Sequence, residues 1–201
     1  VGILFAVVNL AAATTLFIAG TLADKYDRKK IMIAGWAAWI PAPIIFSLAG
    51  DWIQMLPGMI LWGIWLGGPT ATAYITTSAD KNRLTLTFTT LSAGWSVGYI
   101  FGPALGGYIS TVATMRIVFY LAFIFYALAA ANLFFINSQY AKGYAQHDSE
   151  AKPSFLKLLK TGKLLRLSLF FALVMFVVML ARPFIPPFLG EVYSLSDFEI
   201  G

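Results

Sequence analysis

The fold of this chain is decided by a short charged stretch between two long apolar runs, and it reads Gly20-Thr21-Leu22-Ala23-Asp24-Lys25-Tyr26-Asp27-Arg28-Lys29-Lys30. The runs on either side, residues 1–19 and 31–49, contain no Asp, Glu, Lys or Arg. A helix needs roughly 20 mostly apolar residues to cross the hydrocarbon core of a bilayer. A charge at the centre of such a helix costs about 2.5–3.5 kcal/mol. The pattern therefore predicts two membrane-spanning helices joined by a charged turn.

The rest of the chain repeats this pattern. Four further apolar stretches carry no charge in their central parts, and they cover residues 54–78, 84–109, 115–136 and 165–189. Only 11% of all residues are charged and 59% are hydrophobic, whereas a soluble domain carries about 25% charged residues. We therefore expect an all-α, polytopic transmembrane helix bundle with six visible spans.

The basic residues predict the orientation of these spans. Twelve of the 14 lie in connections that follow the first, third and fifth spans, and only Arg116 and Arg182 lie toward the other side. Lys and Arg accumulate on the cytoplasmic side of membrane proteins. We therefore expect residues 20–30, 79–83 and 137–164 to be cytoplasmic in a multi-pass protein of the plasma membrane. The net charge of +5 reflects this topology, which argues against a nucleic-acid partner.

One long polar stretch, residues 138–164, separates the fifth and sixth spans. Within it, residues 155–160 place apolar side chains on one face and lysines on the other, a pattern typical of a helix lying on the membrane surface. The stretch also holds His147, the only histidine, which we interpret as a solvated side chain. The chain has no cysteine, so we expect neither a disulfide nor a thiolate metal site.

The charged turn resembles a signature of the major facilitator superfamily, G-x-L-A-D-[RK]-x-G-[RK]-[RK]. The matching residues are Gly20, Leu22, Ala23, Asp24, Lys25, Arg28 and Lys29. Asp27 replaces the usual glycine. That glycine permits a tight turn with positive φ, and Asp is one of the few other residues that tolerate this conformation. The substitution therefore leaves the geometry of the turn open but not the resemblance.

The resemblance implies that this turn is a cytoplasmic gate. Gly20 would allow a close approach to the other half of the transporter, and Asp24 would lie near the positive end of a helix from that half. Arg28 would pair with nearby acidic residues. Together with Lys25 and Lys29, these contacts would close the cytoplasmic side in the outward-open state.

A second motif lies in the fourth visible span and reads Gly98-Tyr99-Ile100-Phe101-Gly102-Pro103-Ala104-Leu105-Gly106-Gly107. Glycines at 94, 98, 102 and 106 form one bare ridge that allows close helix packing, and Pro103 removes a backbone donor and is expected to bend the helix. The order G-x-x-x-G-P-x-x-G-G is similar to the antiporter motif of the superfamily's fifth span. The residues of this antiporter-type motif are Gly94, Gly98, Gly102, Pro103, Gly106 and Gly107.

These resemblances set the register of the chain. It is expected to cover the second to seventh of twelve spans and to be cut at both ends. Residues 1–137 would then belong to the N-terminal six-helix half, residues 138–164 to the central linker, and residues 165–201 to the start of the C-terminal half. The resemblance places the substrate between the halves, near the membrane midplane.

The same resemblance implies that the stretches 54–78 and 165–189 line the substrate cavity. Their mid-depth side chains are large, aromatic or adaptable, which suits flat or bulky apolar solutes: Trp62, Trp65, Thr70, Met175, Phe176 and Met179. Arg182, near the outer end of the last span, is either a side chain reaching the interface or part of an outer gate.

The sequence thus predicts a secondary transporter that works by alternating access, most simply an efflux antiporter of an amphipathic drug-like compound or metabolite. Uptake of a nutrient or sugar, by symport or uniport, remains an alternative. A membrane sensor or scaffold without transport is another. We expect no enzyme, catalytic residue, cofactor or metal, because the spans lack His, Asp, Glu and Cys. The expected partners are the lipid bilayer, a small-molecule substrate and a coupling ion such as a proton, with the protein acting as a monomer.

Overall fold

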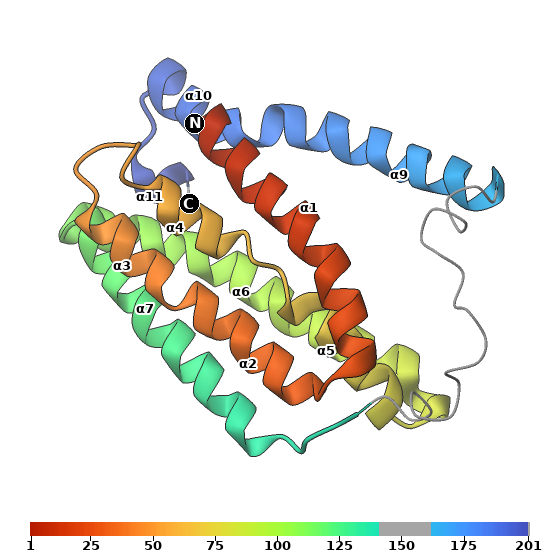
Figure 1. Ribbon diagram of the computed structural model, residues 1–201. Helices are drawn as coiled ribbons and strands as arrows, with labels where there is room; N and C mark the ends of the chain where they lie inside the picture. Colours follow the sequence, from red (N-terminus) through yellow and green to blue (C-terminus); the bar gives the residue numbers. More distant parts are fainter. Residues whose placement is uncertain (141–161, 201) are drawn as a thin grey trace.

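The computed structural model describes residues 1–140 and 162–200, and within these ranges the chain is built of helices without a β-strand (Figure 1). The α-helices of the described residues are α1 (Gly2–Lys25), α2 (Arg28–Trp39), α3 (Pro41–Leu48), α4 (Leu56–Trp62), α5 (Gly67–Ser78), α6 (Leu84–Val112), α7 (Met115–Asn132), α9 (Gly162–Ala181), α10 (Ile185–Tyr193) and α11 (Asp197–Ile200). Short 3-10 helices lie at Lys81–Arg83, Leu133–Phe135 and Arg182–Phe184. The expected all-α class is confirmed. The surface helix expected at residues 155–160 lies outside the described residues.

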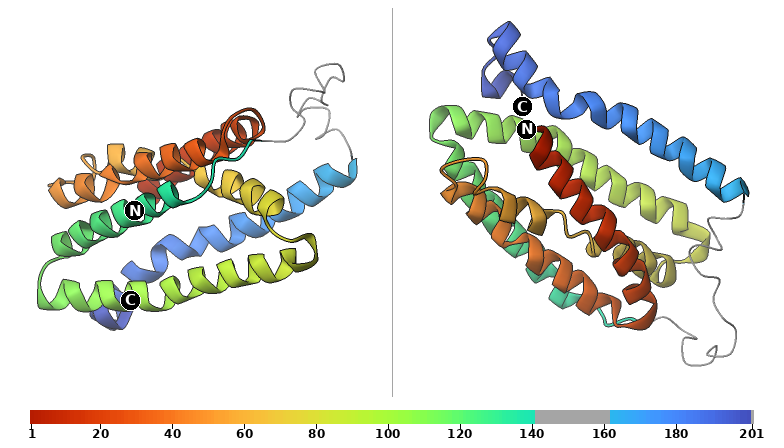
Figure 2. Two further views of the ribbon diagram at one scale, coloured as in Figure 1. Left: turned by 90° about the horizontal axis from the view of Figure 1, so that it is seen from below. Right: turned by 45° about the horizontal axis from the view of Figure 1, so that its top comes forward.

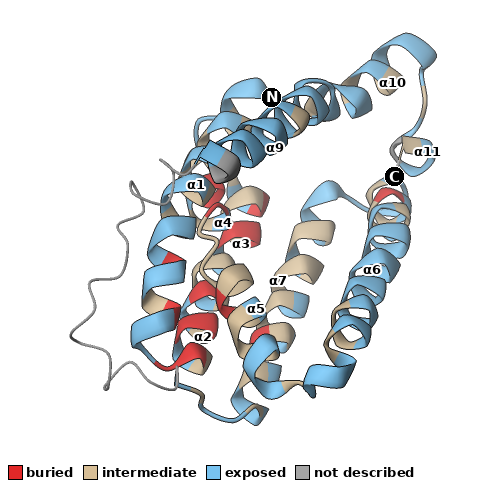
Figure 3. Cartoon of the chain, turned by 90° about the vertical axis from the view of Figure 1, so that its right-hand side faces the viewer, coloured by how far each residue is buried: buried red, intermediate tan, exposed pale blue. Residues whose placement is uncertain are grey.

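The distribution of apolar side chains is that of a protein in lipid. Figure 3 shows buried residues gathered in α1–α5, whereas α6 and α9 are coloured almost entirely exposed. Large apolar side chains such as Leu10 (68% exposed), Trp95 (64%) and Leu173 (64%) lie on the surface. A soluble protein rarely exposes apolar patches of this extent, whereas a bilayer solvates them. The surface therefore follows from the composition of the spans.

Four helical segments are long and apolar enough to cross a membrane: residues 2–25, 28–48, 115–135 and 165–193. The structure thus differs from the six uninterrupted spans expected from the sequence at two places. The stretch 54–78 is broken into α4 and α5. Helix α6 has the length of a span, but Gly, Ser, Thr, Trp and Tyr residues make it less apolar.

The break between α4 and α5 has a local cause in the sequence 63–69, Gly-Ile-Trp-Leu-Gly-Gly-Pro. Glycine costs a helix interior roughly 1 kcal/mol relative to alanine, and three glycines lie within these seven residues. Pro69 lacks an N–H and is tolerated in the first turn of a helix, where that donor has no partner within the helix. The chain therefore ends α4 at Trp62 and begins α5 at Gly67, leaving residues 63–66, here called the broken segment, outside the helices.

Helix α7 connects two sides of the bundle. It packs against α3 on one side and α6 on the other, while α2 packs against α5, and α1 against both α4 and α5. Figure 2 shows α6 and α9 along one side and α1–α3 along the other. Small residues allow the closest of these approaches, since a Cβ on Gly35 of α2 would lie 3.0 Å from the Gly67 nitrogen of α5. This arrangement leaves cavities between the helices.

Candidate functional site

The charged end of the bundle is held together by Arg28, the first residue of α2, whose side chain is only 7% exposed. Its Nη1 donates to the side-chain carbonyl of Gln139 at 2.7 Å and to the hydroxyl of Thr77 at 2.8 Å. Further bonds reach the main-chain carbonyls of Ala73 (3.0 Å) and Ala23 (3.2 Å). One guanidinium offers five donors in a fixed fork, so it joins α1, α5 and the chain after α7. Within the described residues these partners are neutral oxygens, and the pairing of Arg28 with acidic residues that the resemblance implies stays a prediction.

Asp27 does not adopt the left-handed conformation that the usual glycine permits. Its φ is −60° and its ψ is 115°, and its carboxylate caps α2 by accepting the Lys29 N–H at 3.0 Å. The turn is therefore not glycine-like, because an Asp that caps a helix takes extended backbone angles. The carboxylate also accepts the Gln139 N–H at 3.1 Å.

The same contacts decide the ionisation of Asp27, which is only 2% exposed. Burial raises the pKa of its carboxyl. The hydrogen bonds from the Gln139 N–H, the Ser138 hydroxyl and the Lys29 N–H, together with the nearby charge of Lys30, lower this pKa by more than burial raises it. The net result is a pKa below the ordinary value of 3.8. Asp27 is therefore a buried anion at neutral pH.

Gln139, in the chain after α7, is the residue of this end that bonds both Arg28 and α5. Its carbonyl accepts the Arg28 N–H at 2.9 Å, and its Nε2 donates to the Ser78 hydroxyl at 2.6 Å and the Tyr74 carbonyl at 3.3 Å. Lys29 Nζ adds a bond of 2.8 Å to the Phe134 carbonyl. Two connections that the basic residues assign to one side of the membrane, residues 20–30 and the chain after α7, thus meet at the end of α5. We call Asp27, Arg28, Tyr74, Thr77, Ser78 and Gln139 the charged-end cluster.

The remaining residues of the predicted gate motif lie away from this cluster. Gly20, Asp24 and Lys25 are exposed on the last turns of α1. A Cβ added to Gly20 would meet nothing within 4 Å. The structure therefore places Arg28 of the motif in the cluster and Lys29 next to it, where its N–H bonds the Asp27 carboxylate, whereas Gly20, Asp24 and Lys25 are exposed.

The glycine ridge of α6 is open along most of its length. A Cβ on Gly94, Gly98 or Gly102 would meet nothing within 4 Å, whereas one on Gly106 would lie 3.7 Å from Val118 of α7. Gly107 is buried, and α6 continues as one helix through Pro103. Close packing thus occurs only at the α7 end of the ridge within the described residues.

The largest cavity among those described has a volume of about 950 Å³ and is enclosed by six segments of the chain. Its wall is mainly aromatic and aliphatic, and the polar side chains in it are Asn9 and Arg182 besides the tips of Trp and Tyr. No Asp or Glu of the described chain lines it. The lining side chains include Phe5, Val8 and Asn9 from α1, Trp39 from α2, Trp62 and Trp65 at the broken segment, Tyr99 from α6, Tyr126 from α7, and Met179, Arg182, Pro183 and Pro186 from α9 and beyond.

The structure brings some of the predicted cavity residues to this wall and not others. Trp62, Trp65, Met179 and Arg182 line it. Phe176 lines a neighbouring pocket of about 580 Å³, which Met179 shares. Thr70 lies inside the protein, with no exposed surface, and donates to the Leu66 carbonyl at 2.7 Å. Met175 is 52% exposed on α9 and lines none of the cavities described here. Thr70 and Met175 thus line none of the cavities described here, and their place in a substrate cavity stays a prediction.

Sequence reasoning also missed side chains of this wall. Asn9, Trp39, Tyr99 and Tyr126 belong to four helices, and none of these helices was expected to line the cavity. A contact between helices far apart in the chain leaves no periodic signal in a single sequence. The only available signal was the aromatic content of the spans.

Three aromatic side chains of the wall, Trp39, Trp65 and Tyr126, form a cluster with the ring of Trp36. Trp39 lies 4.9 Å from Trp65 and 5.4 Å from Trp36, measured between ring centroids. Tyr126 lies 6.3 Å from Trp39 and 5.9 Å from Trp36. These distances fall in the range of favourable aromatic pairs, each worth about 0.5–1.5 kcal/mol beyond burial. The rings therefore support one another and present stable flat faces.

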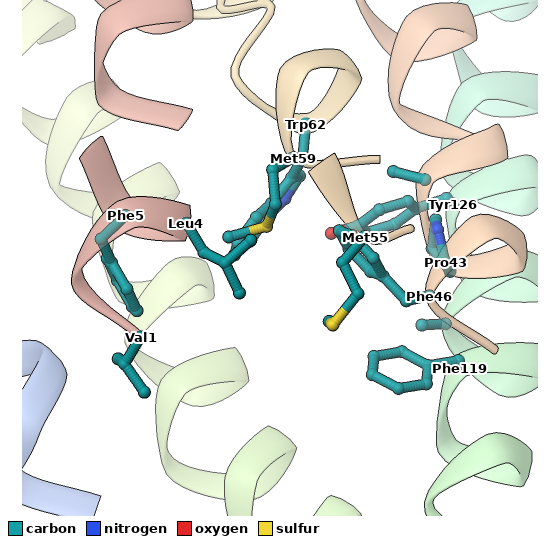
Figure 4. A pocket seen from close by; sticks show the side chains of 12 residues that line it. Val1, Leu4, Phe5, Pro43, Phe46, Met55, Met59, Trp62, Phe119 and Tyr126 are labelled. Carbon is teal, nitrogen blue, oxygen red and sulfur yellow. The ribbon is translucent and has the colours of Figure 1, made fainter. Parts of the chain in front are cut away.

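A smaller pocket of about 380 Å³ lies beside this cavity and shares Trp62 and Tyr126 with it (Figure 4). In the close-up, Leu4 and Phe5 of α1 face Phe119 of α7 across the pocket. Its wall is apolar throughout. Trp62 and Tyr126 thus border both the pocket and the larger cavity.

Lipid-exposed helices around an aromatic cavity define a multi-pass helical membrane protein of the class that contains the secondary transporters. The chain belongs to the Major Facilitator Superfamily, whose sequence profile matches residues 1–201. It is 28% identical to the "Multidrug resistance protein MdtG" of Yersinia enterocolitica, over 97% of this chain and 49% of that protein. It is 37% identical to the "Multi-drug resistance efflux pump PmrA" of Streptococcus pneumoniae, over 64% of this chain and 33% of that protein.

A third relative, the "Multidrug resistance protein MdtG" of Enterobacter lignolyticus, is 31% identical over 84% of this chain and 40% of its own length. The chain therefore spans about half the length of the MdtG relative from Yersinia. The family confirms the resemblance seen in the charged turn and the multi-pass membrane location expected from the spans.

Proposed function

We propose that this chain is part of an efflux antiporter that moves an amphipathic, drug-like compound or metabolite across the plasma membrane by alternating access. The observation that carries the proposal is the 950 Å³ cavity with five Trp and Tyr side chains in its wall. Such a wall suits a flat, largely apolar solute. The printed names of the relatives, multidrug resistance protein and efflux pump, point in the same direction.

Uptake of a sugar fits this cavity less well. A sugar site needs several hydrogen-bonding side chains, because each buried hydroxyl of the solute that lacks a partner is costly. The described wall offers Asn9 and Arg182, and Asn9 Nδ2 already donates to the Phe5 carbonyl of its own helix at 2.7 Å. We therefore favour an amphipathic solute over a nutrient sugar.

We also propose that the charged-end cluster is the cytoplasmic gate of this transporter and that the protein works as a monomer. In this proposal residues 1–137 belong to one half, residues 165–201 to the other, and residues 138–164 connect them. The cluster is rigid because its buried ionic groups, Asp27 and Arg28, have hydrogen-bond partners. During alternating access each half of the transporter moves as one body, and such a movement requires a rigid end.

The proposal is tested with the intact gene product expressed in bacteria that lack their major efflux pumps. Cells are loaded with Hoechst 33342, a flat amphipathic dye, and its fluorescence is followed after energy is supplied. We expect lower accumulation than in cells with an empty vector, and loss of this difference when an ionophore collapses the ion gradients. Equal accumulation in both strains, for this dye and for a panel of other amphipathic compounds, would count against efflux.

A further inference from the structure

The broken segment contacts two neighbouring helices through side chains that the proposed function has not yet used. Thr15 of α1 lies beside it, and the Thr15 hydroxyl accepts the Trp65 N–H at 2.9 Å. The same hydroxyl lies 3.3 Å from the Gly63 carbonyl and bonds the Ala11 carbonyl of its own helix at 2.8 Å. From the other side, the indole N–H of Trp39 donates to the Ile64 carbonyl at 2.7 Å.

These bonds satisfy backbone groups that the break in the helix leaves without partners. A helix interrupted at membrane depth exposes backbone N–H and C=O groups, and each unsatisfied group in an apolar surrounding costs several kcal/mol. Thr15 supplies an acceptor for one donor of the broken segment, and Trp39 supplies a donor for one of its acceptors. The non-helical conformation of the broken segment is therefore stabilised by one side chain from α1 and one from α2.

Close packing limits the broken segment to one position. A Cβ on Gly63 would lie 2.5 Å from the Val8 carbonyl and 2.6 Å from the Ala11 Cβ, so α1 touches the backbone directly at this point. On the far side, a Cβ on Gly68 would collide with the indole of Trp65. The Trp65 ring thus lies in the space left by Gly68, with its position set from both ends of the segment.

We propose that Thr15 and Trp39 are positioning residues that hold the broken segment so that the Trp65 ring stays in the cavity wall, where a flat aromatic solute stacks against it. This inference rests on the proposed function for its solute, but the clamp itself is a property of the fold. Trp65 of the broken segment and Tyr99 of α6 line the same cavity. An aromatic solute therefore finds ring faces from more than one helix.

The chain offers a matched control for Thr15 in its neighbour Thr14. The Thr14 hydroxyl bonds the carbonyls of Leu10 and Ala11 within its own helix, at 3.1 and 2.9 Å. Thr15→Val keeps the shape of the side chain and removes the acceptor for Trp65. Thr15→Ser keeps the hydroxyl, and Thr14→Val removes a hydroxyl that does not reach the broken segment.

The first measurement is hydrogen–deuterium exchange of the intact gene product in lipid nanodiscs, read on peptides that cover residues 63–66. We expect Thr15→Val to speed exchange there by about threefold to tenfold, the effect of losing one hydrogen bond. Thr15→Ser and Thr14→Val should match the wild type. Trp39→Phe, which loses the bond to Ile64, should act in the same direction as Thr15→Val. Unchanged exchange in both Thr15→Val and Trp39→Phe would overturn the clamp.

The second measurement is the concentration dependence of Hoechst 33342 efflux. If Thr15 positions the ring, Thr15→Val raises the apparent KM by about threefold to tenfold, while the maximal rate per molecule at the surface stays within twofold of wild type. A purely structural role would lower the amount of folded protein and leave KM unchanged, and that outcome would overturn the positioning role. Absence of dye movement in the wild type would count against the proposed function, and the exchange experiment would still decide on the clamp.

Discussion

Arg28 and Gln139 are 111 positions apart in the sequence, yet Nη1 of Arg28 donates to Oε1 of Gln139 at 2.7 Å. The pairing is mutual, because the Gln139 carbonyl accepts the Arg28 N–H at 2.9 Å. The start of α2 and the chain after α7 are therefore joined by both main-chain and side-chain bonds. This joint makes the charged end of the bundle one unit.

Gln139→Ala should loosen this unit. The substitution removes the Gln139 side-chain bonds to Arg28, Ser78 and Tyr74, and a buried guanidinium loses one of its acceptors. We expect the free energy of unfolding to fall by about 1–3 kcal/mol, measured by denaturation of the purified protein in detergent micelles. Asn137→Ala is the matched control. The Tyr74 hydroxyl donates to the main-chain carbonyl of Asn137 at 3.1 Å, and this bond remains when the side chain is removed. Equal stability of the two variants would contradict the role given to Gln139.

The ionisation of Asp27 should appear as a pH dependence of stability. Its folded-state pKa lies below the ordinary value of 3.8, so its carboxylate contributes stability that is fully present above that value. This contribution is lost as the pH falls from about 3.8 through the lower folded pKa. Asp27→Asn can still cap α2 but cannot titrate.

We therefore expect wild type to be more stable than Asp27→Asn at pH 7, with the difference vanishing in acid as wild type loses its contribution. Thermal unfolding in detergent at a series of pH values between 7 and 3 measures this. A difference that stayed constant over the whole range would show that the charge of Asp27 plays no part.

Gly63→Ala should disturb the contact between α1 and the broken segment. The added Cβ would lie 2.5 Å from the Val8 carbonyl, which is backbone and cannot rotate away. Overpacking of this kind costs about 1–3 kcal/mol, measured as a loss of stability in the same denaturation assay. Gly67→Ala is the control, because its Cβ would meet only Trp36 Nε1, at 4.0 Å. If both substitutions were equally tolerated, α1 would have to lie farther from Gly63 than it does here.

Trp65→Ala tests the aromatic wall directly. Removing the indole takes away one ring face of the cavity, and an aromatic contact is worth about 0.5–1.5 kcal/mol. We expect the apparent KM for Hoechst 33342 to rise by about threefold to tenfold, with Trp65→Phe closer to wild type. Met175→Ala, on the exposed surface of α9, should leave the KM unchanged. A larger effect at Met175 than at Trp65 would place the solute elsewhere.

Sequence reasoning recovered the elements but not the contacts between them. The apolar runs located the helices, and the residues Gly20 to Lys29 indicated the family that the profile match confirms. Thr70 and Met175 were expected in the cavity because they lie at the right depth. Depth along a helix can be read from position in the chain, but the direction in which a side chain points depends on the neighbouring helices.

The linear order of residues was enough to decide helix type, membrane location and family, because length, hydropathy and local charge act within a single segment. It also contained the cause of the break at residues 63–66, three glycines and a proline, although a continuous span was expected there. Only the tertiary structure decided that Arg28 meets Gln139 and that Thr15 and Trp39 hold the broken segment. Such pairings depend on how separate helices pack against one another, and the distances they span in the chain leave no local pattern.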